Sequence, residues 1–78
     1  MKGGEVMQKY DYSKLLGRMR ERGETQDSMA AKIKISACSM NQKLNNKSDF
    51  KQSEIYNISG ILGIPLADVQ EYFFAHML

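Results

Sequence analysis

Apolar residues recur at helical spacing along most of the chain. The first such stretch has apolar residues at positions i, i+3, i+4 and i+7, namely Tyr12, Leu15, Leu16 and Met19. This spacing places all four on one side of an amphipathic helix. Gly23 follows the stretch, and glycine is the residue that most often closes a helix. The pattern therefore predicts a helix that begins near residue 12 and ends before Gly23.

Two shorter helical stretches follow, and each comes after a residue suited to cap a helix. Thr25 precedes the first stretch, and Ser36 precedes the second, which spans Ala37–Leu44. Threonine and serine side chains accept hydrogen bonds from the free N–H groups at the start of a helix. Only a few residues separate the two helices. These proportions predict a helix-turn-helix over about residues 25–44.

The last third of the chain contains the pattern of two more helices. One is expected over about residues 52–62, ending at Gly63, and the other over about residues 66–74, after Pro65. Proline fits the start of a helix and glycine fits its end. The chain is therefore expected to be all-α, with five helices.

The first eleven residues differ from the rest. They contain two glycines, charges of both signs and no periodic apolar residues. We expect residues 1–11 to form a flexible leader and residues 12–78 to form one domain, because 78 residues suit a single small core.

Basic residues gather around the predicted helix-turn-helix. The net charge is only +2, but residues 28–48 contain four lysines and no acid, whereas residues 55–78 contain two acids and neither lysine nor arginine. Such a cluster is typical either of a solvated lysine-rich face or of a surface that binds a polyanion. Charge alone leaves both interpretations open.

The composition excludes several classes of protein. Cys38 and His76 are the single cysteine and the single histidine, so the chain cannot build an internal disulfide or a zinc site of paired cysteines and histidines. The apolar runs are far shorter than the roughly 20 residues that span a bilayer, and MKGGEVMQKY lacks the apolar core of a signal peptide. We expect a cytoplasmic protein that is not an enzyme and has no metal, cofactor, small-molecule substrate or membrane contact.

The second helix of the predicted pair has side chains suited to reading DNA. Its outward positions are expected to hold Ala37, Cys38, Asn41 and Gln42. Asparagine and glutamine amides match the major-groove edge of adenine, and an alanine can contact a thymine methyl. The same amides are common on any solvated helix. Phosphate contacts are expected from polar and basic residues around the pair, namely Gln26, Ser36, Lys43, Lys47 and Lys51.

Cys38 allows two interpretations. A cysteine near a helix N-terminus can be reactive, which would make it a redox switch in the reading helix. The simpler interpretation is a small uncharged side chain that faces DNA or is partly packed.

The chain resembles the phage Cro and repressor-type helix-turn-helix regulators of Gram-positive bacteria. The resemblance lies in TQDSMAAKIKISACSMNQKLNNK, with YSKLLGRMRERG before it and FKQSEIYNISGILGIPLADVQEYFF after it. It covers about residues 12–74 and implies a five-helix, lambda-repressor-like DNA-binding fold. It also implies that Gln26 lies near the DNA backbone, that the four outward residues of the reading helix face bases, and that Ser36 and Lys43 lie at the groove edge.

Two features depart from that family. Lys34 stands where many relatives have a turn glycine, so it is expected either to loosen the turn or to adopt a left-handed conformation. Ala37 and Cys38 are shorter than the residues that relatives often carry there, which lowers the number of direct base contacts expected.

These observations predict a transcriptional regulator that binds double-stranded DNA and represses by occupying a palindromic operator as a homodimer. Tyr72 and Phe74 are the expected contacts between copies, because three adjacent aromatics cannot all face inward on one helix. The alternative is a protein-interaction module of the same fold, antitoxin-like or an antirepressor, that binds DNA only weakly. Modest charge and the short side chains of the reading helix favour that alternative.

Overall fold

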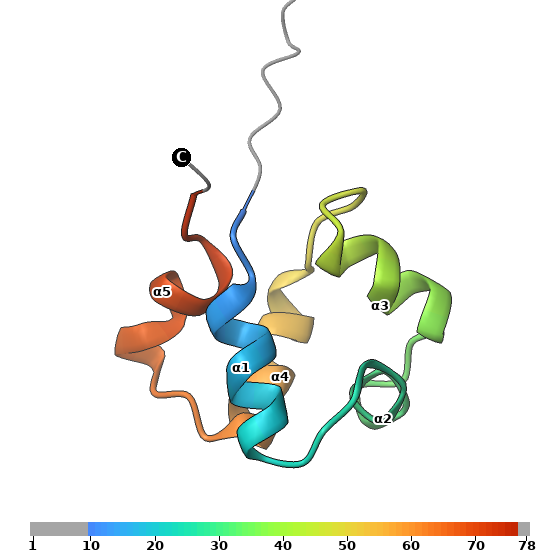
Figure 1. Ribbon diagram of the computed structural model, residues 1–78, viewed down its shortest axis with the longest axis horizontal. Helices are drawn as coiled ribbons and strands as arrows, with labels where there is room; N and C mark the ends of the chain where they lie inside the picture. Colours follow the sequence, from blue (N-terminus) through green and yellow to red (C-terminus); the bar gives the residue numbers. More distant parts are fainter. Residues whose placement is uncertain (1–9, 77–78) are drawn as a thin grey trace, which may run out of the picture.

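The five helices predicted from the sequence appear in a computed structural model, which describes residues 10–76. Within these residues the chain forms α1 (Ser13–Glu21), α2 (Gln26–Lys32), α3 (Ala37–Leu44), α4 (Gln52–Leu62), the 3-10 turn η2 (Leu66–Asp68) and α5 (Val69–Phe73). Figure 1 shows α1 and α4 near the centre, with α5 on one side and the α2–α3 pair on the other. The predicted leader, residues 1–11, lies outside the described residues except for Tyr10 and Asp11.

The predicted caps explain where α2 and α3 begin. Thr25 Oγ1 accepts from the Ser28 N–H at 3.0 Å, and Ser28 Oγ accepts from the Thr25 N–H at 2.8 Å, which is a reciprocal capping box. At the next helix, Ser36 Oγ accepts from the Ser39 N–H at 3.0 Å. Both helices therefore begin at the residues that the sequence indicated.

The ends of α2 and α3 use left-handed residues that are not glycine. Lys34 and Asn46 both have φ of 63°. After α2, the Ile35 N–H donates to Ala30 O at 3.0 Å, and the Lys34 N–H donates to Ala31 O at 3.2 Å. This is the hydrogen-bond pattern of a Schellman motif. Of the two conformations expected for Lys34, the structure has the left-handed one, and the turn stays tight.

The last predicted helix is divided in two. The expected single helix over residues 66–74 is a 3-10 turn followed by one short α-helix. Pro65 is extended, and the Asp68 N–H donates to Pro65 O at 2.9 Å. This i to i+3 bond tightens the first turn, as is common at helix starts.

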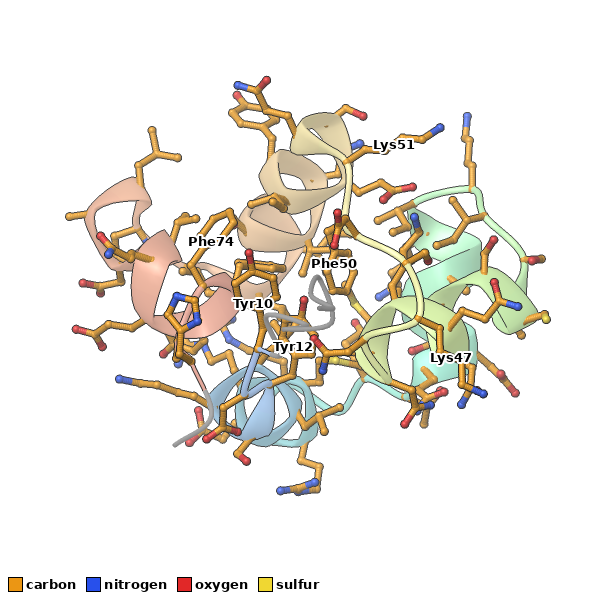
Figure 2. All side chains as sticks on the ribbon, turned by 90° about the horizontal axis from the view of Figure 1, so that it is seen from above. Tyr10, Tyr12, Lys47, Phe50, Lys51 and Phe74 are labelled. Carbon is orange, nitrogen blue, oxygen red and sulfur yellow. The ribbon has the colours of Figure 1, made fainter. Side chains whose placement is uncertain are left out.

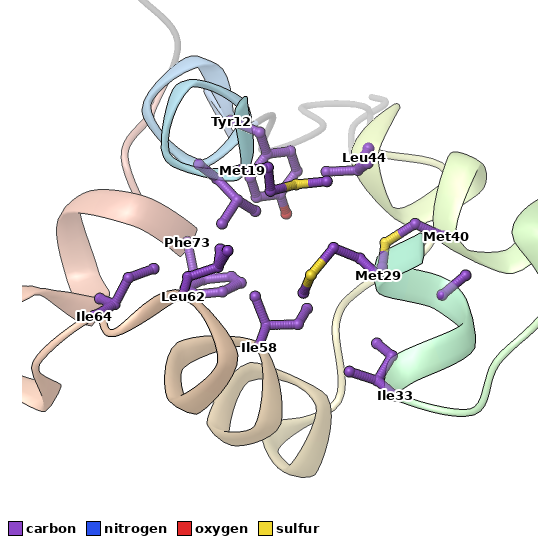
Figure 3. Packing of buried hydrophobic residues seen from close by; sticks show 12 residues of the cluster. Tyr12, Met19, Met29, Ile33, Met40, Leu44, Ile58, Leu62, Ile64 and Phe73 are labelled. Carbon is purple, nitrogen blue, oxygen red and sulfur yellow. The ribbon is translucent and has the colours of Figure 1, made fainter. Parts of the chain in front are cut away.

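One hydrophobic core joins all five helices. Figure 3 shows this core, with Met29 and Met40 on the side of α2 and α3, and Ile64 and Phe73 on the side of α5. Phe50 connects the two sides by edge-to-face packing, at 5.4 Å from the Tyr12 ring and 5.5 Å from the Phe73 ring. The core leaves the outer faces of α3 and α4 available to other molecules.

Both ends of the described chain are attached beside the loop that follows α3. The Tyr10 N–H donates to Asn46 Oδ1 at 2.8 Å, and Asn46 Nδ2 donates to Tyr10 O at 3.0 Å. Tyr10 also forms an isolated antiparallel bridge with His76. Across residues 10–76, no helix has the length and apolar character required to cross a membrane.

Candidate nucleic-acid interface

The α2–α3 pair buries one side of each helix and exposes the other. Met29 and Ala30 of α2, and Met40 and Leu44 of α3, are buried in the common core. Four residues join the helices, so α3 is held close to α2, at the edge of the molecule (Figure 1). The outer surface of α3 is therefore fixed by packing on its inner side.

The four residues expected to face bases share that outer surface. Ala37, Cys38, Asn41 and Gln42 are all exposed, at positions i, i+1, i+4 and i+5 of α3. None is charged, and two end in an amide that both donates and accepts hydrogen bonds. An α-helix with its side chains is about 10–12 Å across, which matches a major groove about 12 Å wide.

A hydrogen bond connects this surface to the start of α2. Asn41 Nδ2 donates to Gln26 Oε1 at 3.3 Å. Both amides are at the protein surface, and each keeps further hydrogen-bonding groups for a ligand. This contact could not be predicted from the sequence, because it depends on the angle at which α2 and α3 cross.

Three of the residues expected to contact phosphate have accessible side chains. Ser36, Lys47 and Lys51 are exposed, although the Ser36 oxygen already caps α3. Figure 2 shows Lys47 near the end of α3 and Lys51 at the start of α4, so they lie at the two ends of the connecting loop. Gln26, also expected at phosphate, is half-buried at the first position of α2.

Lys43, also expected to contact phosphate, is buried in the structure. Its side chain is 9% exposed, and Lys43 Nζ lies 3.1 Å from Glu54 Oε1, whose side chain is equally buried. The ammonium also donates to Asp49 O at 3.0 Å. Glu54 is in the first turn of α4, where its carboxylate also accepts from the Lys51 N–H at 2.8 Å. Lys43 therefore holds α3 against α4 and is not available to a ligand.

Fewer lysines contribute to the positive surface beside α3 than the sequence predicted. Lys32 pairs with Glu24, and hydrogen bonds from Lys32 and Ser28 lower the pKa of that carboxyl. Lys34 and Lys47 are exposed and form no ion pair within residues 10–76. Of the four lysines in residues 28–48, these two therefore supply the exposed, unpaired charge beside α3.

The two expected dimer contacts have different environments. Tyr72 is half-buried and packs against the core, with Lys14 Nζ 5.2 Å from its ring centroid. Lys14 also bonds Glu71, which raises the pKa of the lysine. Phe74 is 42% exposed. Phe74 is therefore the more accessible of the two.

Two comparisons with known proteins give matches. A family model described as "Protein of unknown function (DUF739)" matches residues 7–76. The solution structure of the modulator of repression (MOR) of the temperate bacteriophage TP901-1 from Lactococcus lactis is similar, with 35% sequence identity and a TM-score of 0.72. That alignment covers 91% of this chain and 93% of the other. No curated protein sequence matches. The predicted all-α, five-helix fold is thus confirmed.

Proposed function

The chain belongs to the family described as protein of unknown function (DUF739), and on that premise we propose that it is a phage regulatory protein that binds double-stranded DNA. The similarity to a phage modulator of repression supports the regulatory role. The exposed, uncharged outer surface of α3 supports DNA binding. The proposal is one of binding and includes no catalytic step.

In the proposed complex, α3 enters the major groove and α2 lies across the backbone. Asn41 and Gln42 contact base edges, and Ala37 and Cys38 provide the short side chains that let the helix approach closely. Lys34 and Lys47 lie near phosphates at the two ends of α3. The hydrogen bond from Asn41 to Gln26 carries the proposal, because it orients a base-reading amide from the helix that contacts the backbone.

The regulator is proposed to act by occupying its site as a dimer. A reading helix covers only about one half-site, so two copies on a palindromic operator give the selectivity that one copy lacks. Occupancy then excludes other proteins from the same DNA.

Selection of bound fragments from random DNA tests this function. We expect the wild-type chain to enrich a palindromic sequence, and the Asn41→Ala/Gln42→Ala variant to enrich none, because it loses the amides that read bases. The control is Gln70→Ala, which removes an exposed amide from α5, away from α3. If the double variant and the control both enrich the wild-type sequence, α3 does not read the DNA.

A second function is a protein-interaction module with weak DNA binding, such as an antirepressor. The burial of Lys43 favours it, since one phosphate contact is lost, and so does the similarity to a modulator of repression. This function predicts DNA binding that ignores sequence and disappears at moderate salt.

A further inference from the structure

The outer face of α4 and of the first two residues of η2 has no exposed charge. Between Gln52 and Ala67 the single charged residue is Glu54, and that side chain is buried against Lys43. In a chain with 26% charged residues, sixteen consecutive positions would ordinarily hold about four. Loss of charge from an exposed surface is typical of the centre of a protein interface.

A groove of about 540 Å³ lies within this uncharged face. Phe50 and Ile55 line it on the side of α4, and Val69 and Phe74 line it on the side of α5. Figure 2 shows Phe50 and Phe74 on these two sides. The groove is therefore apolar and is large enough to receive bulky side chains from another chain.

Two large apolar side chains project beside the groove. Tyr56 is 69% exposed and Leu66 is 73% exposed, and both contribute to its lining. The same face thus has both a cavity and the side chains that could fill one. Such a surface is self-complementary, which is the requirement for a twofold interface between identical chains.

Ser59 adds a polar feature to the groove. Its residue is 3% exposed, and Ser59 Oγ has no hydrogen-bond partner among residues 10–76. A buried hydroxyl without a partner is costly. Ser59 Oγ is itself covered, so a tyrosine hydroxyl that enters the groove bonds it only after the lining side chains shift.

We propose that this face, formed by α4, η2 and the end of α5, is the interface between two copies of the chain. Tyr56 and Leu66 of each copy enter the groove of the other, and residues 52–67 of the two copies place no exposed charge in the contact. A dimer formed in this way meets the requirement of the proposed function for two copies, and the interface itself is argued from the residues of this face alone. The interface includes Phe74, whereas Tyr72 lies outside it, with Lys14 over its ring.

Sedimentation equilibrium without DNA tests the interface. The wild-type chain is expected to dimerise between about 1 µM and 1 mM. Leu66→Lys and Tyr56→Lys, each of which places a charge in the contact, should each weaken the dimer at least about tenfold. Ala31→Lys is the matched control, because it adds the same charge at an exposed position of α2 and should leave the dimer intact.

Loss of the dimer can be distinguished from loss of folding, because both substituted residues are exposed in the monomer. Circular dichroism at low concentration should give wild-type spectra for all three variants. A monomeric wild type up to about 1 mM would overturn the inference, and so would a dimer that survives both groove substitutions. Since no DNA is present, either result leaves the operator-binding proposal to its own experiment.

Discussion

Lys43 in α3 and Lys47 in the loop after it are four residues apart and have opposite environments. Lys43 is bonded to Glu54 and to Asp49 O in the interior, whereas Lys47 is exposed beside the end of α3. A buried ion pair is strongly destabilising to break, because the remaining charge is left without a partner. An exposed lysine contributes little to folding but can displace counterions from DNA.

Substitution of Lys43 should therefore affect folding, and substitution of Lys47 should affect DNA binding. Lys43→Met should lower the free energy of unfolding by about 3 kcal/mol, because Glu54 stays buried without its cation. Lys47→Ala should change stability by less than about 0.5 kcal/mol and reduce the salt slope of DNA binding by about one. Urea unfolding and salt titration of the folded proteins measure both effects. A normal stability for Lys43→Met would contradict the buried pair.

The folded protein is expected to lose stability at high pH, because the Tyr12 phenol is buried. Its burial, and secondarily the charge of Asp49, raise the pKa of Tyr12 to about 12. The folded state favours the neutral phenol, so this contribution is complete below the unfolded pKa of about 10 and is lost as pH rises towards 12. The loss amounts to about 3 kcal/mol.

Urea unfolding between pH 10 and 12 checks this prediction. Tyr12→Phe should flatten the decline, whereas Tyr56→Phe, at a tyrosine that is exposed in the monomer, should retain the wild-type decline in samples dilute enough to be monomeric. Equal declines in all three proteins would show that Tyr12 is not the group responsible.

At the scale of elements, α2 and α3 end in the same left-handed geometry with different consequences. Lys34 makes its turn with the backbone alone, whereas the Asn46 side chain also makes two hydrogen bonds to Tyr10. A left-handed residue other than glycine costs about 1 to 2 kcal/mol. Only Asn46 has contacts that offset this cost.

Glycine at these two positions should therefore have opposite effects. Lys34→Gly should raise the free energy of unfolding by about 0.5 to 1 kcal/mol. This is the left-handed strain that glycine removes, less the stabilisation of the unfolded chain by the greater entropy of glycine. Asn46→Gly should lower it by about 1 kcal/mol, because two hydrogen bonds are lost. Thermal and urea unfolding give both values. Changes of the same sign would mean that the Asn46 contacts do not stabilise the fold.

The elements themselves could be predicted from the sequence because their signals are local. Thr25, Ser36 and Gly63 mark helix ends through their own side chains or conformations, and apolar spacing identifies the inward faces. The burial of Lys43 could not be predicted, because it depends on which carboxylate α4 brings opposite α3. The groove beside Tyr56 could not be predicted either, since it exists only where α4 and α5 meet.

At the scale of the whole molecule, the chain has two outer surfaces of different character. The surface of α3 has amides and two nearby lysines, whereas the face formed by residues 52–67 has no exposed charge and presents Tyr56 and Leu66 beside an apolar groove. These surfaces lie on different helices of one small core (Figure 1). The arrangement leaves the α3 surface available to DNA while the α4 face contacts a second copy.

The central claim, that α3 reads DNA sequence, is tested most directly by one ratio of dissociation constants. The selected palindrome and a scrambled duplex of the same composition should be titrated with the wild-type chain at one moderate salt concentration. We predict at least about a thousandfold preference for the palindrome. A preference below about tenfold, with both complexes lost as salt increases, would contradict the account and would instead indicate an interaction module with electrostatic affinity for any DNA.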